Sequence, residues 1–454
     1  MNLSIIILAA GQGTRMRSDL PKVLHPLGGR PLLAHVIDTA RCFDNAALHV
    51  VAGHGVERVR DAFPDPAIHW ITQEQQLGTG HAVAQVLPNV PDDHAVLVMY
   101  GDVPLIRKDT LGALQVIAMN NEVGLLTAEL DDPAGYGRIL RTVDGSIVGS
   151  VEEKDATDEQ RRIREVNTGF VAAPARKLRN WVDSLDNNNT QGEYYLTDII
   201  AMAVADDTTV RGVTTRDRNE VLGVNTHAQL ATLERCYQLR QAMACMEDGV
   251  TLIDPARFDL RGRLVAGQDV FIDVNAVLEG EIMLGDRVHI GPNCVLRDIT
   301  AGDDSTILAN CVIEEATIGK ASRIGPFARI RPETQLAENT RVGNFVEIKN
   351  SGIGTGSKIN HLSYIGDTTI GRDVNIGAGT ITCNYDGANK HRTVIGDGVF
   401  IGSDTQLIAP VKVADGATIG AGSIITSDAP AGELTLSRAP QETRKGWQRP
   451  VKKK

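Results

Sequence analysis

Two different spacings of apolar residues divide the chain into two halves. In the first half, short apolar runs alternate with amphipathic stretches as far as about Ala205. These patterns predict strands at residues 3–8, 48–52 and 95–99, and helices at residues 33–41 and 82–87. Such alternation is typical of an α/β domain with a largely parallel, Rossmann-like sheet, which binds ligands at the carboxyl ends of its strands.

In the second half, an aliphatic residue recurs at every sixth position. The repeat forms three series, which are Ile272 to Leu296, Val312 to Ile348 and Ile395 to Ile425. Neither a helix nor a simple alternating strand produces a period of six, whereas a parallel β-helix does. We therefore expect a three-sided solenoid of hexapeptide repeats, with the aliphatic side chains stacked inside it.

Two further segments complete the organisation of the chain. The repeat is interrupted between Ile376 and Ile395, and we expect the residues between them to leave the solenoid as a loop. Residues 227–248 contain no Pro or Gly and predict one long helix. The expected division is thus a first domain at 1–227, a linker helix at 228–248 and a β-helix domain at 249–454.

Composition and charge exclude some classes of protein. The chain has 454 residues, a net charge of -11 and a pI of about 5.5, which argues against nucleic acid or a membrane surface as its partner. None of the six Cys residues forms a C-x-x-C pair, and this suits a reducing compartment. Without a recognisable signal peptide or a membrane-spanning run, we expect a cytoplasmic protein.

Phosphate chemistry is suggested by the loop that follows the first predicted strand. Gly11 and Gly13 lie in this loop, which has neither the Lys-Ser/Thr ending of a Walker loop nor the third glycine of a dinucleotide fingerprint. Its backbone N–H groups could still bind an anion, with Arg15 and Lys22 adding positive charge. Asp102 follows another predicted strand and, taken alone, is also typical of a turn.

These segments belong to a larger ordered set of motifs that resembles the sugar-1-phosphate nucleotidyltransferases. The set comprises residues 8–16, 21–22, 76–82, 100–105, 135–138, 151–156, 165–169 and 223–225. Together with the hexapeptide half, the whole chain resembles the bacterial bifunctional N-acetylglucosamine-1-phosphate uridylyltransferases and glucosamine-1-phosphate N-acetyltransferases. One difference is Gln12, where members of this family often carry Lys.

The resemblance implies a two-step synthesis of UDP-N-acetylglucosamine, a precursor of peptidoglycan and lipopolysaccharide. In the first domain it implies uridylyl transfer from UTP with Mg²⁺ held by Asp102 and Asn225, and Arg15 and Lys22 as catalytic cations. The residues implied to bind nucleotide and sugar are Leu8, Ala9, Ala10, Gly11, Lys22, Gln73, Gly78, Thr79, Tyr100, Gly101, Asp102, Gly137, Glu152, Asn167 and Asn225.

In the second domain the resemblance implies acetyl transfer from acetyl-CoA to glucosamine-1-phosphate. His361 is the implied general base, because a histidine can accept a proton near neutral pH. Arg331 and Lys349 are eighteen residues apart, one coil of a three-sided β-helix, so they should share a face. The residues implied to bind the amino-sugar phosphate are Arg331, Lys349, Tyr364 and Asn375, and those implied to bind acetyl-CoA are Ala378, Asn384, Tyr385, Ser403, Ala421 and Arg438.

The family also implies a left-handed β-helix that assembles as a homotrimer with shared acetyl-transfer sites. Two other functions fit parts of the sequence. One is a single-activity nucleotidyltransferase with a regulatory β-helix, and the other is a non-catalytic scaffold. His361 and the loop at residues 379–390 argue against the first, and the combination of the glycine loop, Lys22 and Asp102 argues against the second.

Overall fold

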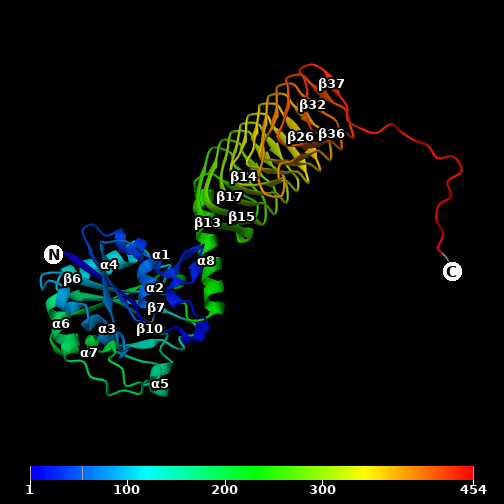
Figure 1. Cartoon of the computed structure of the whole chain (residues 1–454). Helices are drawn as coiled ribbons and strands as arrows, with labels where there is room; N and C mark the ends of the chain where they lie inside the picture. The colour runs from blue at the N-terminus through cyan, green and yellow to red at the C-terminus, as the bar shows by residue number, and fades with distance from the viewer. Residues whose placement is uncertain (1, 54, 453–454) are drawn as a thin grey trace. The chain divides into compact units, whose positions relative to one another are not determined.

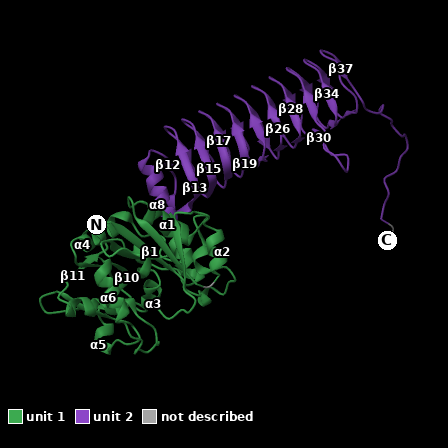
Figure 2. Cartoon of the chain, turned by 60° about the vertical axis from the view of Figure 1, so that its left-hand side comes forward, with its two compact units in different colours: residues 1–237 green, residues 238–454 purple. Residues whose placement is uncertain are grey.

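The chain folds as two compact units, Met1–Tyr237 and Gln238–Lys454, which Figure 2 shows in different colours. The computed structural model describes residues 2–53 and 55–452. The boundary between the units falls within helix α8, His227–Glu247, which agrees with the long helix expected from the sequence. None of the helices in the described part of the chain is long and apolar enough to span a membrane.

Unit 1 is built on one mixed sheet with the main strand order β11-β7-β10-β6-β1-β4-β5. Its strands are β1 Leu3–Ala9, β4 Ala47–Ala52, β5 Ile68–Thr72, β6 Ala95–Tyr100, β7 Val123–Glu129, β8 Gly137–Arg141, β9 Ile147–Val151, β10 Glu165–Pro174 and β11 Val210–Thr214. Strands β4, β1 and β6 run parallel, whereas β10 is antiparallel to both β6 and β7. The carboxyl ends of β1 and β6 therefore lie at the same edge.

Alternate residues of β1 explain why this sheet is buried on both faces. Ile5 and Ile7 belong to one hydrophobic core, while Ile6 and Leu8 belong to another. Successive side chains of a strand point to opposite faces, so a continuous aliphatic run fills two cores at once. The helices of this unit are α1 Leu32–Arg41, α2 Val56–Asp61, α3 Thr79–Ala84, α4 Lys108–Met119, α5 Asp158–Arg161, α6 Ala175–Asp183 and α7 Ile199–Ala205.

One predicted helix of unit 1 has different bounds. The sequence predicted a helix at residues 82–87, but α3 ends at Ala84, and a short 3₁₀ turn follows at Leu87–Asn89. Pro88 lies in that turn and cannot donate the hydrogen bond that would continue an α-helix. The observed α3 instead begins at Thr79, directly after Gly78, which places its N-terminus at the edge of the sheet that carries the glycine loop.

Unit 2 is a parallel β-helix, as the six-residue period predicted (Figure 1). One side consists of β12 Thr251–Leu252, β14 Phe271–Ile272, β16 His289–Ile290, β18 Thr306–Ile307, β20 Arg323–Ile324, β23 Arg341–Asn344, β26 Lys358–His361, β29 Asn375–Ile376, β32 Phe400–Ile401, β35 Thr418–Ile419 and β37 Leu434–Thr435. The aliphatic residues of this column are buried and stack in register from β12 to β35, as Ile272, Ile290 and Ile307 do, whereas Leu434 of β37 is exposed.

The other two sides of the β-helix are joined in the first coils and separate in the later ones. The long bent strands are β13 Phe258–Ala266, β15 Ala276–Leu284, β17 Val295–Ala301 and β19 Val312–Ile318. One column then continues as β21 Arg329–Ile330, β24 Glu347–Lys349, β27 Tyr364–Gly366, β30 Ile381–Cys383, β33 Gln406–Ile408 and β36 Ile424–Ile425. The other continues as β22 Thr334–Leu336, β25 Gly352–Ile353, β28 Thr368–Ile370, β31 Thr393–Ile395 and β34 Val411–Val413.

The interruption of the repeat is shorter than the sequence suggested. Residues 381–383 remain in the solenoid as β30, and the chain returns to it at Thr393 in β31. Only residues 384–392 leave the coil, and Tyr385 pairs with Lys390 in a short antiparallel bridge. Thr382 is buried and continues the internal stack, since it pairs with Leu407 on the next coil.

Candidate active sites

The glycine loop of unit 1 packs directly against the segment that carries Lys22. Gly13 has a φ of 64°, and a β-carbon there would lie 2.8 Å from the β-carbon of Lys22. A side chain at Gly13 is therefore excluded both by its left-handed backbone and by the Lys22 stem. The loop thus fixes the lysine beside the end of β1.

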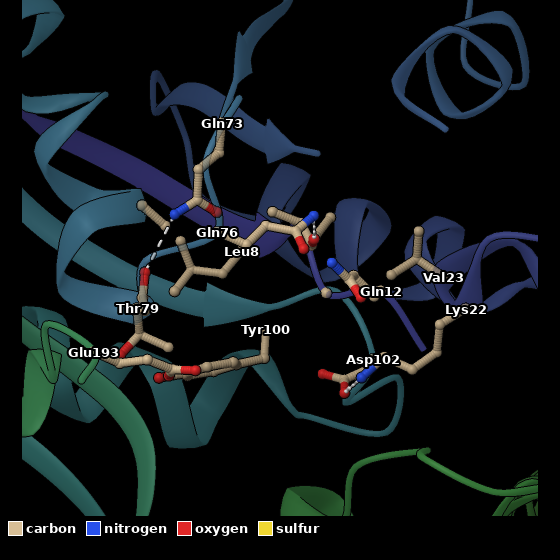
Figure 3. Close-up of a pocket in the computed structure, with 15 residues that line it drawn as sticks. Leu8, Gln12, Lys22, Val23, Gln73, Gln76, Thr79, Tyr100, Asp102 and Glu193 are labelled. Carbon is tan, nitrogen blue, oxygen red and sulfur yellow. Dashed lines mark hydrogen bonds and ion pairs between the residues drawn. The ribbon is translucent and has the colours of Figure 1, made fainter. Parts of the chain in front are cut away.

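A cavity of about 470 Å³ lies over this loop, at the carboxyl ends of β1 and β6. Its lining residues are Leu8, Ala9, Ala10, Gly11, Gln12, Lys22, Val23, Gln73, Gln76, Gly78, Thr79, Ala82, Tyr100, Asp102 and Glu193. Figure 3 shows Lys22 and Asp102 directed toward each other at one end, with Gln73 and Thr79 at the other. Segments far apart in the sequence therefore converge on one concave site.

Lys22 joins the two residues expected to hold a metal ion. Its Nζ donates to Asp102 Oδ2 at 2.5 Å and to Asn225 Oδ1 at 3.1 Å. The chain near Asn225 is tied to β6 as well, because the backbone N–H of Val224 donates to the carbonyl of Asp102. One cation thus already contacts both oxygen atoms.

The far end of the cavity is ordered by two glutamines. Gln73 is buried, and its Nε2 lies 3.2 Å from the Gly78 carbonyl oxygen and 2.9 Å from His81 Nδ1. Gln76 Nε2 donates to the carbonyl of Ala10 at 2.8 Å, which ties its turn to the glycine loop. Thr79 Oγ1 accepts the backbone N–H of Leu196 at 3.2 Å. These contacts hold polar groups at fixed positions.

The three residues expected to bind the sugar form a second group. Gly137 pairs with Asn167, and a β-carbon at Gly137 would lie 3.4 Å from Glu152 Oε1. Thr197 Oγ1 donates to that carboxylate oxygen at 3.0 Å. Burial raises the pKa of Glu152, the Thr197 hydrogen bond lowers it, and the charge of Asp198 raises it further. The result is a carboxylate in a poorly solvated position.

Three further predicted residues of unit 1 are Tyr100, Gly101 and Arg15, of which only Tyr100 lines the cavity. Tyr100 packs edge-on against Phe170, and burial raises the pKa of its hydroxyl. Gly101 donates its N–H to the carbonyl of Leu8 and thereby links β6 to β1. Arg15 is exposed and does not line the cavity. The structure therefore does not bring Arg15 together with the other predicted residues.

Several cavity residues were not selected from the sequence. They are Gln12, Val23, Gln76, Ala82 and Glu193. Gln76 and Ala82 lie within a motif that the sequence analysis identified, and Gln12 and Val23 adjoin residues selected there. Glu193 comes from a loop with no motif, so only the fold reveals it.

In unit 2, His361 lies on the exposed surface of β26 and is paired with the preceding coil. Its Nδ1 lies 3.0 Å from Asn344 Oδ1 in β23. Because an amide oxygen can only accept, Nδ1 is the donor in this contact, and the lone pair of the neutral ring then lies on Nε2. Asn344 was not predicted, although it is one coil before His361.

The two cations expected to share a face do so, and a third joins them. Arg331 and Lys349 follow paired residues of β21 and β24 on adjacent coils, and Arg331 also donates to Glu347 at 2.8 Å. The ammonium of Lys390, in the loop at 384–392, lowers the pKa of Lys349, and Arg331 adds to this effect. Lys390 is a further residue that the sequence analysis did not select.

Tyr364 and Asn384 meet at the base of the same loop. A β-carbon at Gly366 would lie 2.5 Å from the Tyr364 hydroxyl and 2.8 Å from Asn384 Nδ2. Asn384 Nδ2 donates to the buried carboxylate of Asp367, whose other oxygen accepts from Asn350. Asp367 therefore anchors the start of the loop to the solenoid.

The residues expected to bind acetyl-CoA follow one corner of the β-helix. The N–H of Asp404 donates to the Ala378 carbonyl, and the N–H of Gly422 donates to the Ser403 carbonyl. The guanidinium of Arg438 donates to the carbonyl of Ala421 at 2.8 Å.

The other two predicted ligands of unit 2 flank this corner. Asn375 in β29 pairs with Lys358 of β26, the strand that carries His361. Tyr385 is exposed, and its hydroxyl donates to the Gly387 carbonyl at 2.6 Å. The fold thus places Asn375 and the predicted acetyl-CoA ligands after His361, on later coils and on the adjoining loop.

Comparison with known proteins assigns both units. Residues 5–140 match the MobA-like NTP transferase domain, residues 281–315 match the hexapeptide repeat of succinyl-transferase, and residues 392–427 match the bacterial transferase hexapeptide. A bifunctional protein GlmU from Alkalilimnicola ehrlichii is 58% identical over 99% of this chain and 96% of its own length. The chain belongs to the bifunctional GlmU family. A second GlmU, from Marinobacter nauticus, is 56% identical over 99% of both chains.

Membership of the GlmU family decides between the alternatives left by the sequence. The match extends through both units, so the β-helix is a transferase domain and not only a regulatory or structural module. Uridylyl transfer and acetyl transfer are the two activities of the chain, with nucleotide and acetyl-CoA as substrates.

Proposed function

We propose that the cavity of unit 1 catalyses attack by N-acetylglucosamine-1-phosphate on the α-phosphorus of UTP. A new P–O bond forms, the bond between the α- and β-phosphates breaks, and pyrophosphate leaves. The observation that carries this proposal is the cluster of Lys22, Asp102 and Asn225 beside the glycine loop. The cluster provides cation sites next to backbone N–H groups, and the reaction of two anions requires both.

The proposal includes Mg²⁺ at Asp102 and Asn225. A carboxylate and an amide oxygen suit this ion, and the contacts of the Lys22 ammonium show that one cation can touch both. No group of three or more His, Cys, Asp or Glu side chains suited to a metal occurs among the described residues. When bound, the ion would neutralise charge on the phosphates.

The remaining groups of this cavity position the two substrates. Lys22 would contact the phosphates, and Gln73 would recognise the uracil base with its buried amide. Glu152 and Asn167 would bind the sugar. Arg15, on the exposed side of the loop, would reach the phosphates only after a movement of its side chain.

For unit 2, we propose that His361 Nε2 accepts a proton from the amine of glucosamine-1-phosphate as the amine attacks the acetyl thioester. A C–N bond forms, the C–S bond breaks, and CoA leaves. Asn344 holds the Nδ1–H form of the imidazole, so that Nε2 faces the substrate with its lone pair. The cluster of Arg331, Lys349 and Lys390 would bind the sugar phosphate.

The proposal keeps the uridylyltransferase domain at 1–227, the linker at 228–248 and the acetyltransferase domain at 249–454. It also includes assembly of three copies through the β-helix. The regular flat sides of the solenoid support such packing, and measurement of the molar mass in solution by sedimentation equilibrium tests it.

The two activities are tested in one assay with glucosamine-1-phosphate, acetyl-CoA, UTP and Mg²⁺, in which free CoA and pyrophosphate are followed together. Wild type should release both. His361→Ala should release neither, but should form pyrophosphate from added N-acetylglucosamine-1-phosphate. Asp102→Ala should still release CoA while forming little pyrophosphate. Normal release of CoA by His361→Ala would contradict its assigned role.

A further inference from the structure

The position of Lys22 suggests a role that phosphate binding alone does not explain. Its ammonium lies within hydrogen-bonding distance of Asp102 Oδ2 and Asn225 Oδ1, the two oxygens proposed to bind Mg²⁺. The side chains of Lys22 and Asp102 are only 12% and 17% exposed. The ammonium thus occupies a sheltered position that a metal ion would need.

We propose that Lys22 is a displaceable counter-ion of the metal site. It neutralises Asp102 and keeps Asn225 close while the site holds no metal, and it gives way when a divalent cation enters. This inference rests on the metal site proposed above. It adds a positioning role for Lys22 that precedes substrate binding.

The cost of burying an unpaired carboxylate explains why such a counter-ion is needed. A carboxylate withdrawn from water is destabilised unless a cation or hydrogen-bond donors replace its hydration. Lys22 supplies a full charge to Asp102 and one further hydrogen bond to Asn225. The two oxygens are thereby held together before any metal arrives, which reduces the ordering required on binding.

The ammonium and the metal cannot occupy the position together. Mg²⁺ lies about 2.0–2.1 Å from its oxygen ligands, whereas Lys22 Nζ is already 2.5 Å from Asp102 Oδ2. Two cations so close to one oxygen atom would repel each other strongly in a poorly solvated site. A metal bound at both Asp102 Oδ2 and Asn225 Oδ1 would therefore require the lysine to leave.

A destination for the displaced ammonium lies nearby. Lys22 Nζ is 3.8 Å from the position that a β-carbon at Gly11 would occupy, and Gly11 itself has no side chain to obstruct it. A small movement takes the ammonium toward the glycine loop, where the phosphates of UTP are proposed to bind. Lys22 would thus have a carboxylate partner before loading and a phosphate partner afterwards.

Manganese binding in the absence of nucleotide tests the proposal. Mn²⁺ takes the same oxygen ligands as Mg²⁺, and electron paramagnetic resonance measures the free ion directly. We expect Lys22→Met to bind one Mn²⁺ about tenfold more tightly than wild type, the ratio for a competing interaction of about 1.4 kcal/mol. Arg15→Met is the control, because it removes the same charge from the neighbouring glycine loop without touching Asp102. Its affinity should stay close to that of wild type.

A second measurement, the melting temperature, tests whether Lys22 stabilises the protein as the counter-ion of Asp102. In EDTA, Lys22→Met should melt at a lower temperature than wild type, and saturating Mn²⁺ should remove most of that difference. Asp102→Ala should abolish the manganese site in both backgrounds.

The possible failures are distinguishable. Equal Mn²⁺ affinity in wild type and Lys22→Met, with the site still dependent on Asp102, would overturn the counter-ion role and leave the metal site intact. An equal gain in Arg15→Met would show a general charge effect and also overturn it. If neither wild type nor Lys22→Met binds Mn²⁺, both the metal site and the inference are overturned.

Discussion

Asn344 and His361 show how the β-helix positions the proposed general base with very few contacts. The two residues lie opposite each other on adjacent coils, and the amide oxygen accepts from the imidazole. The backbone register of the solenoid sets their separation, so a single hydrogen bond is enough to select the ring's protonation pattern. A histidine on a loop would need more partners to reach the same order.

Replacing Asn344 by Ala should therefore damage acetyl transfer through His361. We expect kcat to fall by about tenfold to hundredfold, because a misoriented catalytic group slows the reaction by about this much. The KM for glucosamine-1-phosphate should change little. Steady-state release of CoA measures both constants, and pyrophosphate formation by the same sample serves as the folding control. A change in KM alone, or a parallel loss of both activities, would contradict a positioning role.

Glu152 presents the opposite case, a group whose surroundings oppose its charge. Burial raises the pKa of its carboxyl, and the hydrogen bond from Thr197 offsets only part of this effect. A carboxyl whose folded-state pKa is raised contributes stability at low pH, and that contribution is lost as the pH rises through the folded-state pKa. The ionised form at neutral pH thus lowers the stability of the free protein.

Glu152→Gln should consequently melt at a higher temperature than wild type at pH 8, and this gain should disappear as the pH falls below the ordinary pKa of a glutamate. The KM for N-acetylglucosamine-1-phosphate should rise, because the proposed carboxylate ligand of the sugar is lost. Melting curves across the pH range provide the measurement. A gain of the same size at low pH would show that burial of the charge is not its origin.

At the scale of elements, a ladder of charged residues crosses the first coils of the β-helix. We define the Arg–Glu ladder as Arg261, Glu279, Arg297, Glu314 and Arg329, which come from β13, β15, β17, β19 and β21. Each glutamate contacts an arginine on either side, so replacing one glutamate removes two ion pairs. Such a network stabilises more effectively than isolated surface pairs do.

Glu279, which contacts both Arg261 and Arg297, offers a direct test. Contact with Arg297 lowers the pKa of Glu279, so its contribution is present above the ordinary pKa and is lost as the pH falls. Glu279→Gln should cost about 1 kcal/mol at neutral pH and low salt, and less in 1 M salt because of screening. Urea unfolding measures this cost, with Glu281→Gln on the same strand as the control. An equal effect of the two variants would show that the ladder contributes nothing specific.

The sequence predicted elements where one strong pattern determines them. The six-residue period determines the strands within Ile272–Leu296, Val312–Ile348 and Ile395–Ile425, because each coil there repeats the same packing, and β1 is evident from its aliphatic run. Two bounds depend on single residues that depart from the surrounding pattern. Pro88 affects where α3 ends, and Thr382 affects where β30 lies. Partners from distant segments, such as Glu193 and Asn344, have no local signal at all.

At the scale of the whole molecule, the division into two units does not coincide with the end of a helix. The first half of α8 packs into unit 1, where Leu233 is 1% exposed and joins a core with Leu27 and Leu32. Tyr237 also contacts His35 edge-on. These two residues belong to the proposed linker at 228–248, so the first part of the linker packs on the proposed domain at 1–227.

Two fragments should distinguish these boundaries. We expect residues 1–237 to fold and to retain uridylyl transfer, because their hydrophobic cores are complete. Residues 1–227 should be less stable by about 2–5 kcal/mol, the usual cost of losing one large core side chain. Thermal melting and pyrophosphate release of the two fragments provide the comparison. Equal stability would favour the shorter domain.

The stacking of coils in unit 2 has a consequence for how this half of the protein can change in evolution. Ile272 lies against Ile290 and Ile290 against Ile307, so each coil is accepted only if it returns the chain to register. The length of the solenoid can therefore change only in steps of one coil. A whole coil can be gained or lost without disturbing its neighbours, while any other insertion has to be expelled at a corner. Residues 384–392 are an insertion of this kind, which leaves the coil as a loop. New binding functions on this scaffold would arise most readily in loops at the corners of the coils.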